Sequence, residues 1–349
     1  MGKRIKVLYT IPNFKTAGSQ YVLLSLFNGI DKTKFDPYVC VENYPELIPE
    51  SIPLERRLIF KYTGNITSDI SQFRKILKSR NIDLIHSWDY KSNYIEPLAG
   101  RLSKVKYLYT KKNNAWSKRW MLKSILSNHI IYNNPEMKKR FFNSLLFYNK
   151  TTFIPHGIDT SVFKFSSRRY QNTFNLGCIA NINSNKNQLL LVKALKVLPK
   201  NVELHLYGNE NKEYRITINN YIERHNLGNR VHFHGFIDNK YIPKVLSAFN
   251  LFILPSFNEG LPVSILEALA CEVPVLSSDS GGGARFLLKQ EYIFSTQNKE
   301  ELISKILKIY SLKEDERRTI ATKSLKYNIE THTLQTEIFA HEKLYEKLI

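Results

Sequence analysis

The sequence predicts an α/β fold with two domains, each built on a parallel β-sheet that helices cover. The chain has 349 residues, which is enough for two domains of ordinary size. Short, uninterrupted apolar runs alternate with helical patterns, and this alternation is typical of a parallel sheet that is buried on both faces. A strand, a polar loop and a helix follow one another at the start of each half, at residues 5–29 and 175–198.

The first half is predicted to contain six strands, at Ile5–Ile11, Tyr38–Glu42, Leu84–Ser87, Val105–Thr110, His129–Tyr132 and Thr151–Ile154. A polar loop at 13–20 and a helix at Tyr21–Gly29 follow the first strand, which is the order of a Rossmann unit. The loop contains one glycine, Gly18, where a dinucleotide fingerprint has three. Two interpretations of Gly18 stay open: a tight turn, or a place where a backbone N–H approaches a bound group.

The second half is predicted to begin after the turn Pro155–Asp159 and a polar linker, Ser166–Asn172. Its strands are expected at Asn175–Ala180, Glu203–Tyr207, Val231–Phe236, Leu251–Leu254 and Val273–Ser277. The tail, Lys323–Ile349, has a helical pattern of apolar residues. We therefore expect domains at 1–165 and 166–330, and a C-terminal helix at 331–349.

The charge and the cysteines narrow the class of protein. The net charge is +20, and residues 101–140 hold eleven basic residues against one acid. The three cysteines lie far apart and show neither a disulfide framework nor a zinc spacing, which favours a reducing compartment. No apolar signal-peptide core opens the chain, and no apolar run approaches the length of a membrane span. We expect a cytoplasmic protein.

The basic region contains a predicted helix, Trp116–Asn128, whose role stays open. Its apolar side is expected to hold Trp120, Met121, Leu122, Ile125 and Leu126, and its basic side Lys118, Arg119 and Lys123. Such a helix can lie in the interface of an anionic membrane, where each basic residue contributes about 1 kcal/mol. The alternative is a helix that faces the core and leaves a solvated basic side.

The segment Leu254–Ala270 carries the strongest functional pattern. A buried strand ends at Pro255, a polar loop holds Glu259, and a helix with Glu267 begins near Pro262. The N-terminus of a helix favours anions, because its backbone N–H groups are free. The two glutamates, about 12 Å apart along the helix, suit hydroxyl groups at the two ends of an extended ligand better than they suit one shared metal ion.

This segment resembles the Glu-x7-Glu signature of retaining GT-B glycosyltransferases of family 4, with the flanking Pro255, Ser256, Gly260 and Pro262 in place. The resemblance implies two Rossmann-like domains that face each other across a cleft, with the last helix crossing back to the first domain. It also implies that Glu259 holds hydroxyls of the donor sugar and Glu267 the ribose, while amides near Gly260 and Leu261 stabilise the leaving diphosphate.

A second part of the family pattern, Gly-Arg-x4-Lys, is only partly present. Ala180 and Asn181 replace the glycine and arginine, and Lys186 remains. The resemblance implies that Lys186 neutralises the diphosphate and that Asn181 lies at the donor, although an ordinary surface lysine is the alternative. Arg285, in the glycine-rich turn after 278–283, is a hypothetical replacement for the missing cation.

The resemblance also suggests contacts outside these motifs. Phe236, with Ile237, is a candidate contact of the nucleotide base, or else a core residue, and Gly18 is a candidate neighbour of the transferred group. The family histidine of the first domain is absent, so Lys112 or Asn113 is expected to take its place at the sugar or acceptor. His86, at a strand end, is a candidate there, with a structural role as the alternative.

We therefore expect a retaining glycosyltransferase that uses a UDP- or GDP-linked sugar donor and a saccharide or lipid-linked saccharide acceptor, in the synthesis of a surface polysaccharide or glycolipid. No Asp-x-Asp occurs in a suitable loop, so no metal and no further cofactor are expected. The alternatives are an epimerase of nucleotide sugars with the same fold, and a basic protein that binds nucleic acid. The sequence contains no recognised nucleic-acid motif, so no nucleic-acid partner is expected.

Overall fold

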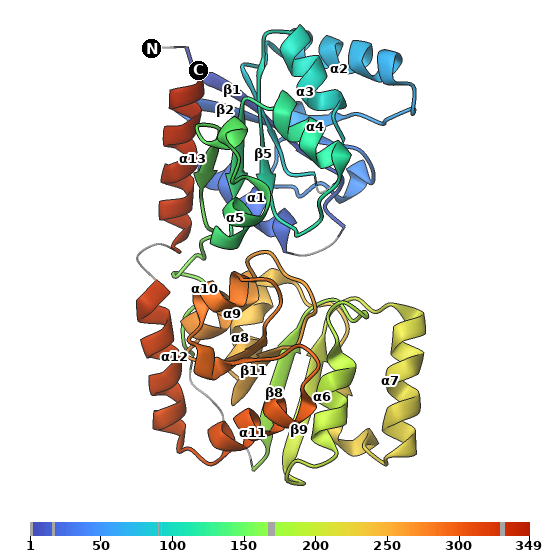
Figure 1. Ribbon diagram of the computed structural model, residues 1–349, viewed down its shortest axis with the longest axis vertical. Coiled ribbons are helices and arrows are strands. Elements are labelled where there is room, and N and C mark those ends of the chain that lie inside the picture. The colour runs from blue at the N-terminus through green and yellow to red at the C-terminus, as the bar shows by residue number, and fades with distance from the viewer. Residues whose placement is uncertain (1–2, 16–17, 90, 92, 167–171, 329–331) are drawn as a thin grey trace. The chain divides into compact units, whose positions relative to one another are not determined.

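The computed structural model describes the whole chain except residues 1–2, 16–17, 90, 92, 167–171 and 329–331. The chain forms two compact units (Figure 1). The first contains residues 1–157 and 334–349, and the second contains residues 158–333. The chain thus leaves the first unit once and returns to it for its last helix.

The first unit is built on a seven-stranded sheet in the order β3-β2-β1-β4-β5-β6-β7, in which every pairing is parallel. Its strands are β1 Ile5–Ile11, β2 Phe35–Val41, β3 Arg57–Ile59, β4 Leu84–Ser87, β5 Lys106–Lys111, β6 His129–Tyr132 and β7 Thr151–Phe153. The two inner strands β2 and β4 are buried along their whole length, as expected when both faces are covered.

Helices cover both faces of this sheet. They are α1 Ser19–Gly29, α2 Ile66–Arg80, α3 Ile95–Leu102, α4 Lys118–Leu126, α5 Pro135–Phe141 and α13 Leu334–Leu348. One core joins α2, α3, α4 and α5 to the sheet through residues such as Phe73, Trp120 and Phe141. On the other face α13 packs against α1, and Tyr345 contacts the rings of Tyr9 and Phe35 (Figure 1).

The second unit has a six-stranded parallel sheet in the order β10-β9-β8-β11-β12-β13. Its strands are β8 Phe174–Ile179, β9 Val202–Tyr207, β10 Val231–Phe233, β11 Leu251–Leu254, β12 Val275–Ser278 and β13 Ile293–Phe294. The run Leu251–Leu254 is at most 1% exposed, so this strand is buried on both faces as its composition predicts.

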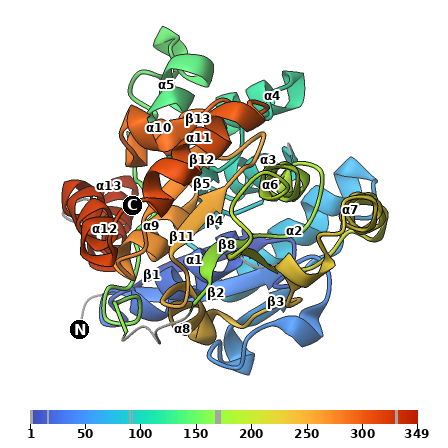
Figure 2. The same cartoon turned by 90° about the horizontal axis from the view of Figure 1, so that it is seen from below.

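Two cores cover the faces of the second sheet. Its helices are α6 Gln188–Leu195, α7 Lys212–Arg224, α8 Ile242–Leu246, α9 Val263–Ala270, α10 Gly283–Leu287, α11 Lys299–Tyr310 and α12 Glu314–Asn328. One core joins α6, α7 and α11 to the sheet, and the other joins α8, α9, α10 and α12. Figure 2 shows α6 and α7 on one side of β8 and β11, and α9 and α12 on the other.

The predicted strands are present, and their bounds differ from the predicted ones by a few residues at most. The sequence analysis missed the short strands β3 and β13 because they have three and two residues. The predicted helical tail is two helices, α12 and α13, with residues 329–331 between them outside the described part. The predicted linker Ser166–Asn172 also lies mostly outside it.

The division between the units falls after Gly157, earlier than the predicted boundary at residue 165. The reason is packing, since Ile158 and Phe163 belong to the core of the second unit. The backbone of Ile158 also donates a hydrogen bond to the carbonyl of His332, 2.9 Å away, where the chain leaves the same unit. Both crossing points of the chain are therefore held in the second unit.

The strand order places a switch point in each sheet. In the first sheet the chain order reverses between β1 and β4, and in the second between β8 and β11. Loops that leave two such strands at their carboxyl ends diverge to opposite faces, which opens a space for ligands in sheets of this kind. A ligand site is therefore expected at the carboxyl ends of these four strands.

Candidate functional site

The loops at the switch point of the second sheet hold each other in place. One loop follows β8 and the other follows β11. The backbone N–H of Phe257 donates to the carbonyl of Asn185 at 2.7 Å, and the side-chain amide of Asn185 donates to the carbonyl of Asn258 at 3.1 Å. Asn187 donates from its side chain to the carbonyl of Pro255 at 3.3 Å. The two loops are therefore joined by hydrogen bonds into one edge of the sheet.

A third loop, which follows β12, joins this edge through its glycines. The backbone N–H of Glu259 donates to the carbonyl of Ser280 at 2.7 Å. Gly282 has a φ of 90°, which favours glycine, and leads into α10. A Cβ atom on Gly283 would lie 2.0 Å from the carbonyl oxygen of Gly260, so only glycine lets the two backbones approach this closely. The backbone around Gly260, next to the start of α9, is thereby fixed.

Lys186 and Glu259 meet at this edge. The Lys186 ammonium lies 2.5 Å from a Glu259 carboxylate oxygen, and the two side chains are 24% and 13% exposed. Lys186 comes from the loop before α6 and Glu259 from the loop before α9, so the pair spans the switch point. A cation and an acid with hydrogen-bonding capacity thus lie side by side, partly accessible, where a ligand is expected.

Glu267 lies one helical turn into α9, on a part of the helix that is mostly buried. Burial raises the pKa of Glu267 to about 7, with no charge or hydrogen bond from the described residues contributing to the shift. A carboxyl group of this kind is poised to accept hydrogen bonds from hydroxyl groups, because such bonds compensate the cost of burying its charge.

This buried acid predicts a pH dependence of stability. The pKa of Glu267 is higher in the folded than in the unfolded state, so the folded protein binds more protons between pH 4.5 and 7, and stability falls as pH rises through this range. We expect Glu267→Gln to remove this fall in stability. Between pH 4 and pH 8 the unfolding free energy of the variant should rise by about 1–3 kcal/mol relative to that of the wild type. Urea unfolding at several pH values measures this.

The matched control is Glu50→Gln, which removes an exposed acid of the first unit. Its unfolding free energy should follow that of the wild type at every pH. Equal pH profiles for Glu267→Gln and the wild type would show that Glu267 is not held in a desolvated state.

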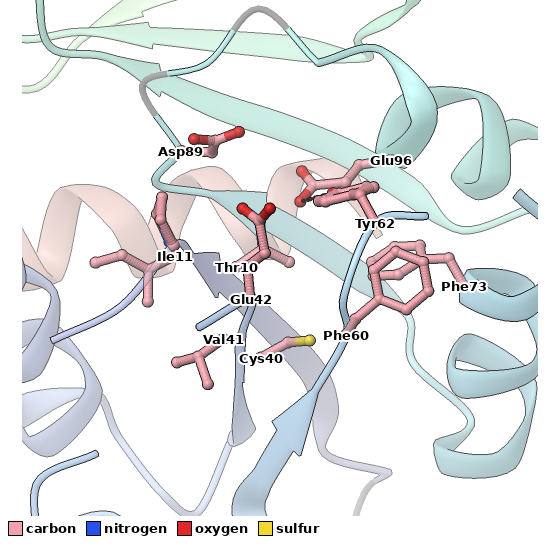
Figure 3. Close-up of a pocket in the computed structure, with 11 residues that line it drawn as sticks. Thr10, Ile11, Cys40, Val41, Glu42, Phe60, Tyr62, Phe73, Asp89 and Glu96 are labelled. Atoms are coloured by element: carbon pink, nitrogen blue, oxygen red, sulfur yellow. Dashed lines mark hydrogen bonds between the residues drawn. The ribbon is translucent and has the colours of Figure 1, made fainter. Parts of the chain in front are cut away.

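A second group of acids lies at the switch point of the first sheet. Thr10 and Ile11 at the end of β1, Glu42 after β2 and Asp89 after β4 line a pocket with Glu96 of α3. Figure 3 shows the carboxylates of Glu42, Asp89 and Glu96 directed toward the same space. The pocket is therefore a small hollow at the carboxyl edge of the sheet that combines three acids with a mainly apolar lining. The Glu42 carboxylate is paired with the Lys91 ammonium at 2.6 Å.

Glu96 is the most buried acid of this pocket. It is 3% exposed, and the hydroxyls of Tyr62 and Tyr107 donate to its two oxygens at 3.2 Å each. Burial raises the pKa of Glu96, and the nearby Lys123 partly opposes this. Sequence reasoning missed these acids. Glu42 and Asp89 follow strands and could have been noticed for that reason, whereas Glu96 reaches the pocket from a helix.

Comparison with known proteins follows the same division of the chain. The family described as Glycosyltransferase Family 4 matches residues 16–162, and the family described as Glycosyl transferases group 1 matches residues 159–326. The chain belongs to the GT-B glycosyltransferases of this type. Its two parallel-sheet units are the two Rossmann-like domains of that fold.

Individual relatives agree with this membership. The chain is 25% identical over 226 residues to CapH of Staphylococcus aureus, a capsular polysaccharide biosynthesis glycosyltransferase. This match covers 60% of the chain and 62% of CapH, so the chain spans less than two thirds of the length of CapH. It is 24% identical over 313 residues to WclY of Escherichia coli, an O-antigen biosynthesis glycosyltransferase, covering 79% and 80%. The fold matches that of HepE from Anabaena, crystallised with UDP and glucose, with a TM-score of 0.82, 18% identity and 99% of both chains covered.

Arg285, the predicted replacement for the missing family cation, lies on α10, directly after the glycine-rich turn. Its guanidinium is ion-paired with Asp279, although its side chain is 54% exposed. Like Lys186, it is therefore paired with an acid in the ligand-free protein, and its role as the replacement for the missing family arginine stays a prediction. Lys186 is the cation that the structure brings to Glu259.

Phe236 and Asn181 lie at the same carboxyl edge. Phe236 follows Gly235, and its ring is 52% exposed, which excludes the core role that was the alternative. Its neighbour Ile237 is partly buried and packs against the core. The carbonyl of Asn181 accepts a hydrogen bond from Gln188 at 3.0 Å, which fixes the start of the loop that carries Lys186.

His86 has a structural role, and its candidacy for the site is corrected. The ring is fully buried, and its nitrogens lie 2.6 Å from the Tyr345 hydroxyl and 2.7 Å from the Thr110 hydroxyl. Burial, followed by His341 and Lys112, holds the pKa of His86 well below its usual range. Both nitrogens are committed to joining β4 to α13 and β5, so neither is available to a ligand.

Lys112 and Asn113 also have partners within the first domain. Lys112 donates to the carbonyl of Trp88, and burial lowers its pKa to about 7, with Asp89 opposing. The side-chain oxygen of Asn113 accepts from the Lys111 ammonium at 2.6 Å. Both residues thus support the loop after β5. Gly18 has a φ of 90° and precedes α1, which fits either interpretation of its role, and residues 16–17 of its loop lie outside the described part.

Part of the basic region, residues 101–140, is buried and does not lie on the surface. Lys111 and Lys123 are fully buried. Lys123 donates to the carbonyl of Lys91 at 3.1 Å and lies 5.1 Å from the ring centres of Tyr109 and Trp120. Burial lowers the pKa of Lys111 to about 7. The predicted sides of the helix are therefore wrong, since Trp120 and Lys123 of α4 face the interior together.

The outer side of α4 carries apolar side chains instead. Met121, Leu122 and Ile125 are 37%, 40% and 38% exposed, next to the exposed Lys118 and Arg119. None of the helices in the described ranges is long and apolar enough to span a bilayer.

Proposed function

We propose that this protein is a retaining glycosyltransferase that moves a sugar from a UDP- or GDP-linked donor to a hydroxyl of a saccharide or lipid-linked saccharide. The observation that carries the proposal is the Lys186–Glu259 pair at the switch point of the second sheet, next to the start of α9. Family membership and the UDP and glucose bound to HepE support it.

Donor binding gives Lys186 and Glu259 new partners in place of each other. In the ligand-free protein the two charges neutralise each other across 2.5 Å. When a nucleotide sugar binds, the Lys186 ammonium turns to the diphosphate, and the Glu259 carboxylate accepts hydrogen bonds from sugar hydroxyls. The amides of Gly260 and Leu261 add donors at the start of α9, and Phe236 offers a ring for the base. Glu267 takes the ribose hydroxyls.

Catalysis then depends on the charge that develops on the leaving group. The bond between the anomeric carbon and the donor phosphate oxygen breaks, and a bond from that carbon to the acceptor oxygen forms on the same face. The acceptor proton passes to the departing phosphate. Lys186 and the fixed amides are in place before the reaction, so they stabilise the diphosphate without reorganisation. No metal or further cofactor is proposed, because no Asp-x-Asp is present in the edge loops.

The acidic pocket of the first domain is the proposed acceptor side. Glu42, Asp89 and Glu96 present oxygens that accept hydrogen bonds from hydroxyl groups. A neutral, hydroxyl-rich acceptor suits these acids better than an anionic one, because like charges repel in a partly buried space. The names of CapH and WclY support a role in the synthesis of a surface polysaccharide or glycolipid.

The test is release of nucleoside diphosphate from a panel of UDP- and GDP-sugars, with and without short saccharide or lipid-linked acceptors, in the presence of EDTA. We expect release that requires an acceptor, and a product whose new linkage keeps the α configuration by NMR. Interconversion of the sugar without transfer would instead show an epimerase. Binding of RNA with no turnover of any donor would reject the transferase.

We further propose that the protein works in the cytoplasm and docks on an anionic membrane surface through α4. The carbonyl of Ile125 accepts hydrogen bonds from Arg101 at 3.1 Å and from Lys150 at 3.0 Å, so basic residues surround the exposed apolar side chains. Apolar insertion and basic contacts together hold peripheral proteins on anionic lipids.

The double change Leu122→Asp and Ile125→Asp should lower sedimentation with vesicles of phosphatidylglycerol and phosphatidylethanolamine at least about tenfold, because it removes apolar area and adds negative charge. Leu307→Asp alters a residue of the second domain that is 39% exposed and should leave sedimentation unchanged. Equal sedimentation of all three proteins would reject docking through α4.

A further inference from the structure

A cluster of histidines lies away from the donor edge, on strands β9 and β10. Glu203 and His205 lie two residues apart on β9. His232 on β10 and His234 directly after this strand are also two residues apart. Side chains two residues apart in a strand share a face, and His232 lies directly beside His205 in the register of the two strands. Leu204 and Leu206 point into the core, so the four polar side chains share the opposite face of the sheet.

The side chains of this cluster already lie close together. His232 Nε2 is 2.9 Å and His205 Nε2 is 3.8 Å from the same oxygen of Glu203. One ligating atom from each of the three residues lies within 4.8 Å of the others. Ligands of a tetrahedral zinc ion, with Zn–N bonds of 2.0–2.1 Å, are about 3.4 Å apart. Small side-chain movements would therefore complete three corners of such a site.

We propose that Glu203, His205 and His232 bind one zinc ion at the β9–β10 edge of the second sheet, with a solvent molecule as the fourth ligand. Two imidazoles and one carboxylate form a donor set that suits Zn²⁺ and does not suit Mg²⁺ or Ca²⁺, which prefer oxygen ligands. The three side chains are 19–35% exposed, so an ion can reach them from solvent.

His234 contacts His205 and orients its ring without being a ligand of the ion. Its Nε2 lies 3.1 Å from His205 Nδ1, and the two rings stack with centres 5.4 Å apart. A hydrogen bond at Nδ1 directs Nε2 of His205 toward the metal, which is the usual way in which a second residue orients a metal-binding histidine. His205 Nε2 also lies 3.3 Å from the side-chain oxygen of Asn175, and the ion would replace this contact. The rings of His205 and His232 also stack, 4.8 Å apart, so both are held in the orientation described.

The ion would stabilise the edge strand β10 against β9. β10 has three residues and pairs only with β9 within the described part of the second sheet. Gly235 and Phe236 follow it at once, and the carbonyl of Gly235 accepts from Gly208 at 2.8 Å. A metal that joins both strands, at His205 three residues before Gly208 and at His232 three residues before Gly235, would stabilise the segment that carries Phe236. The role proposed is structural, and it leaves the metal-independent transfer as it is.

The experiment is a titration of zinc chloride into the full-length chain without a histidine tag, after dialysis against a chelator, with competition by a fluorescent zinc indicator. We expect one equivalent to bind and thermal unfolding to shift upward with zinc, because the ion binds the folded state. The double variant His205→Asn and His232→Asn should lose more than about 100-fold in affinity, and His234→Asn about 10- to 100-fold.

His225→Asn is the matched control, since it removes a histidine at the end of α7, outside the cluster. It should bind zinc as the wild type does. Circular dichroism and UDP binding show whether each variant is folded. Absence of zinc binding to the wild type at 100-fold excess over protein would overturn the proposal. So would an equivalent of zinc that stays bound in the folded double variant, because the ion would then lie elsewhere.

Discussion

Replacing Lys186 with methionine is expected to lower kcat about 10²- to 10³-fold, the loss found when one donor to a developing negative charge is removed. The ammonium is the cation that the second domain brings to Glu259, and the Gly-Arg part of the family pattern that would supply another is Ala180-Asn181 here. Arg285, the predicted replacement for that cation, is paired with Asp279 in the ligand-free protein. The measurement is the single-turnover rate at saturating donor.

The control for this variant is Lys212→Met, at the start of α7, where the side chain is exposed. It should transfer sugar at the wild-type rate. The methionine at 186 also leaves Glu259 without its counter-ion, so donor affinity should fall as well, which a separate titration measures. A kcat within threefold of wild type for Lys186→Met would contradict the assigned role.

The substitution Gly283→Ala should both destabilise the second domain and reduce transfer about 100-fold. The new Cβ would lie 2.0 Å from the carbonyl oxygen of Gly260 and 2.9 Å from the ring of Pro262, so the loop before α9 must move. Overpacking of this kind costs about 1–3 kcal/mol. A shift of about 1 Å in positioning groups is enough for a loss near 100-fold. Thermal unfolding and initial rates measure the two effects.

Gly228→Ala provides the comparison, because a Cβ there meets no atom within 4 Å and its backbone is not in the left-handed region. It should keep wild-type activity and stability. If Gly283→Ala had the same activity as Gly228→Ala, the contact between the two glycine backbones would not position the donor edge.

The fold could be predicted because its signals are local. The run Leu251–Leu254 followed by Pro255 shows a buried strand and its end, and the loop residues Lys186 and Glu259 follow two such strands. The carboxyl ends of parallel strands meet at one edge of a sheet, so the sequence places these two residues together. Their direct contact, which leaves each charge neutralised before a ligand binds, needs the coordinates.

The interior of the first domain could not be predicted in the same way. A charge count treats Lys111 and Lys123 as surface residues, although both are buried against aromatic rings. Their positions depend on the packing of neighbouring elements, which the pattern of β5 or of α4 alone does not show. The acidic pocket has the same origin, since Glu96 and Tyr62 come from different elements and meet only through tertiary structure.

The histidine cluster shows a further limit. Glu203-Leu-His205 and His232-Phe-His234 are each ordinary in a strand, and 26 residues separate the two patterns. The register of β9 against β10 makes them neighbours, and register is set by the hydrophobic pattern of both strands and not by the histidines.

The most direct test of the account is an isothermal titration of UDP and GDP into the wild type and into Lys186→Met. We expect one of the two nucleotides to bind the wild type at one site per chain, and its affinity to fall at least about tenfold in the variant, because a charged hydrogen bond is lost. Equal affinity in both proteins, or no binding of either nucleotide, would contradict the claim that this edge of the second domain binds the diphosphate of a sugar donor.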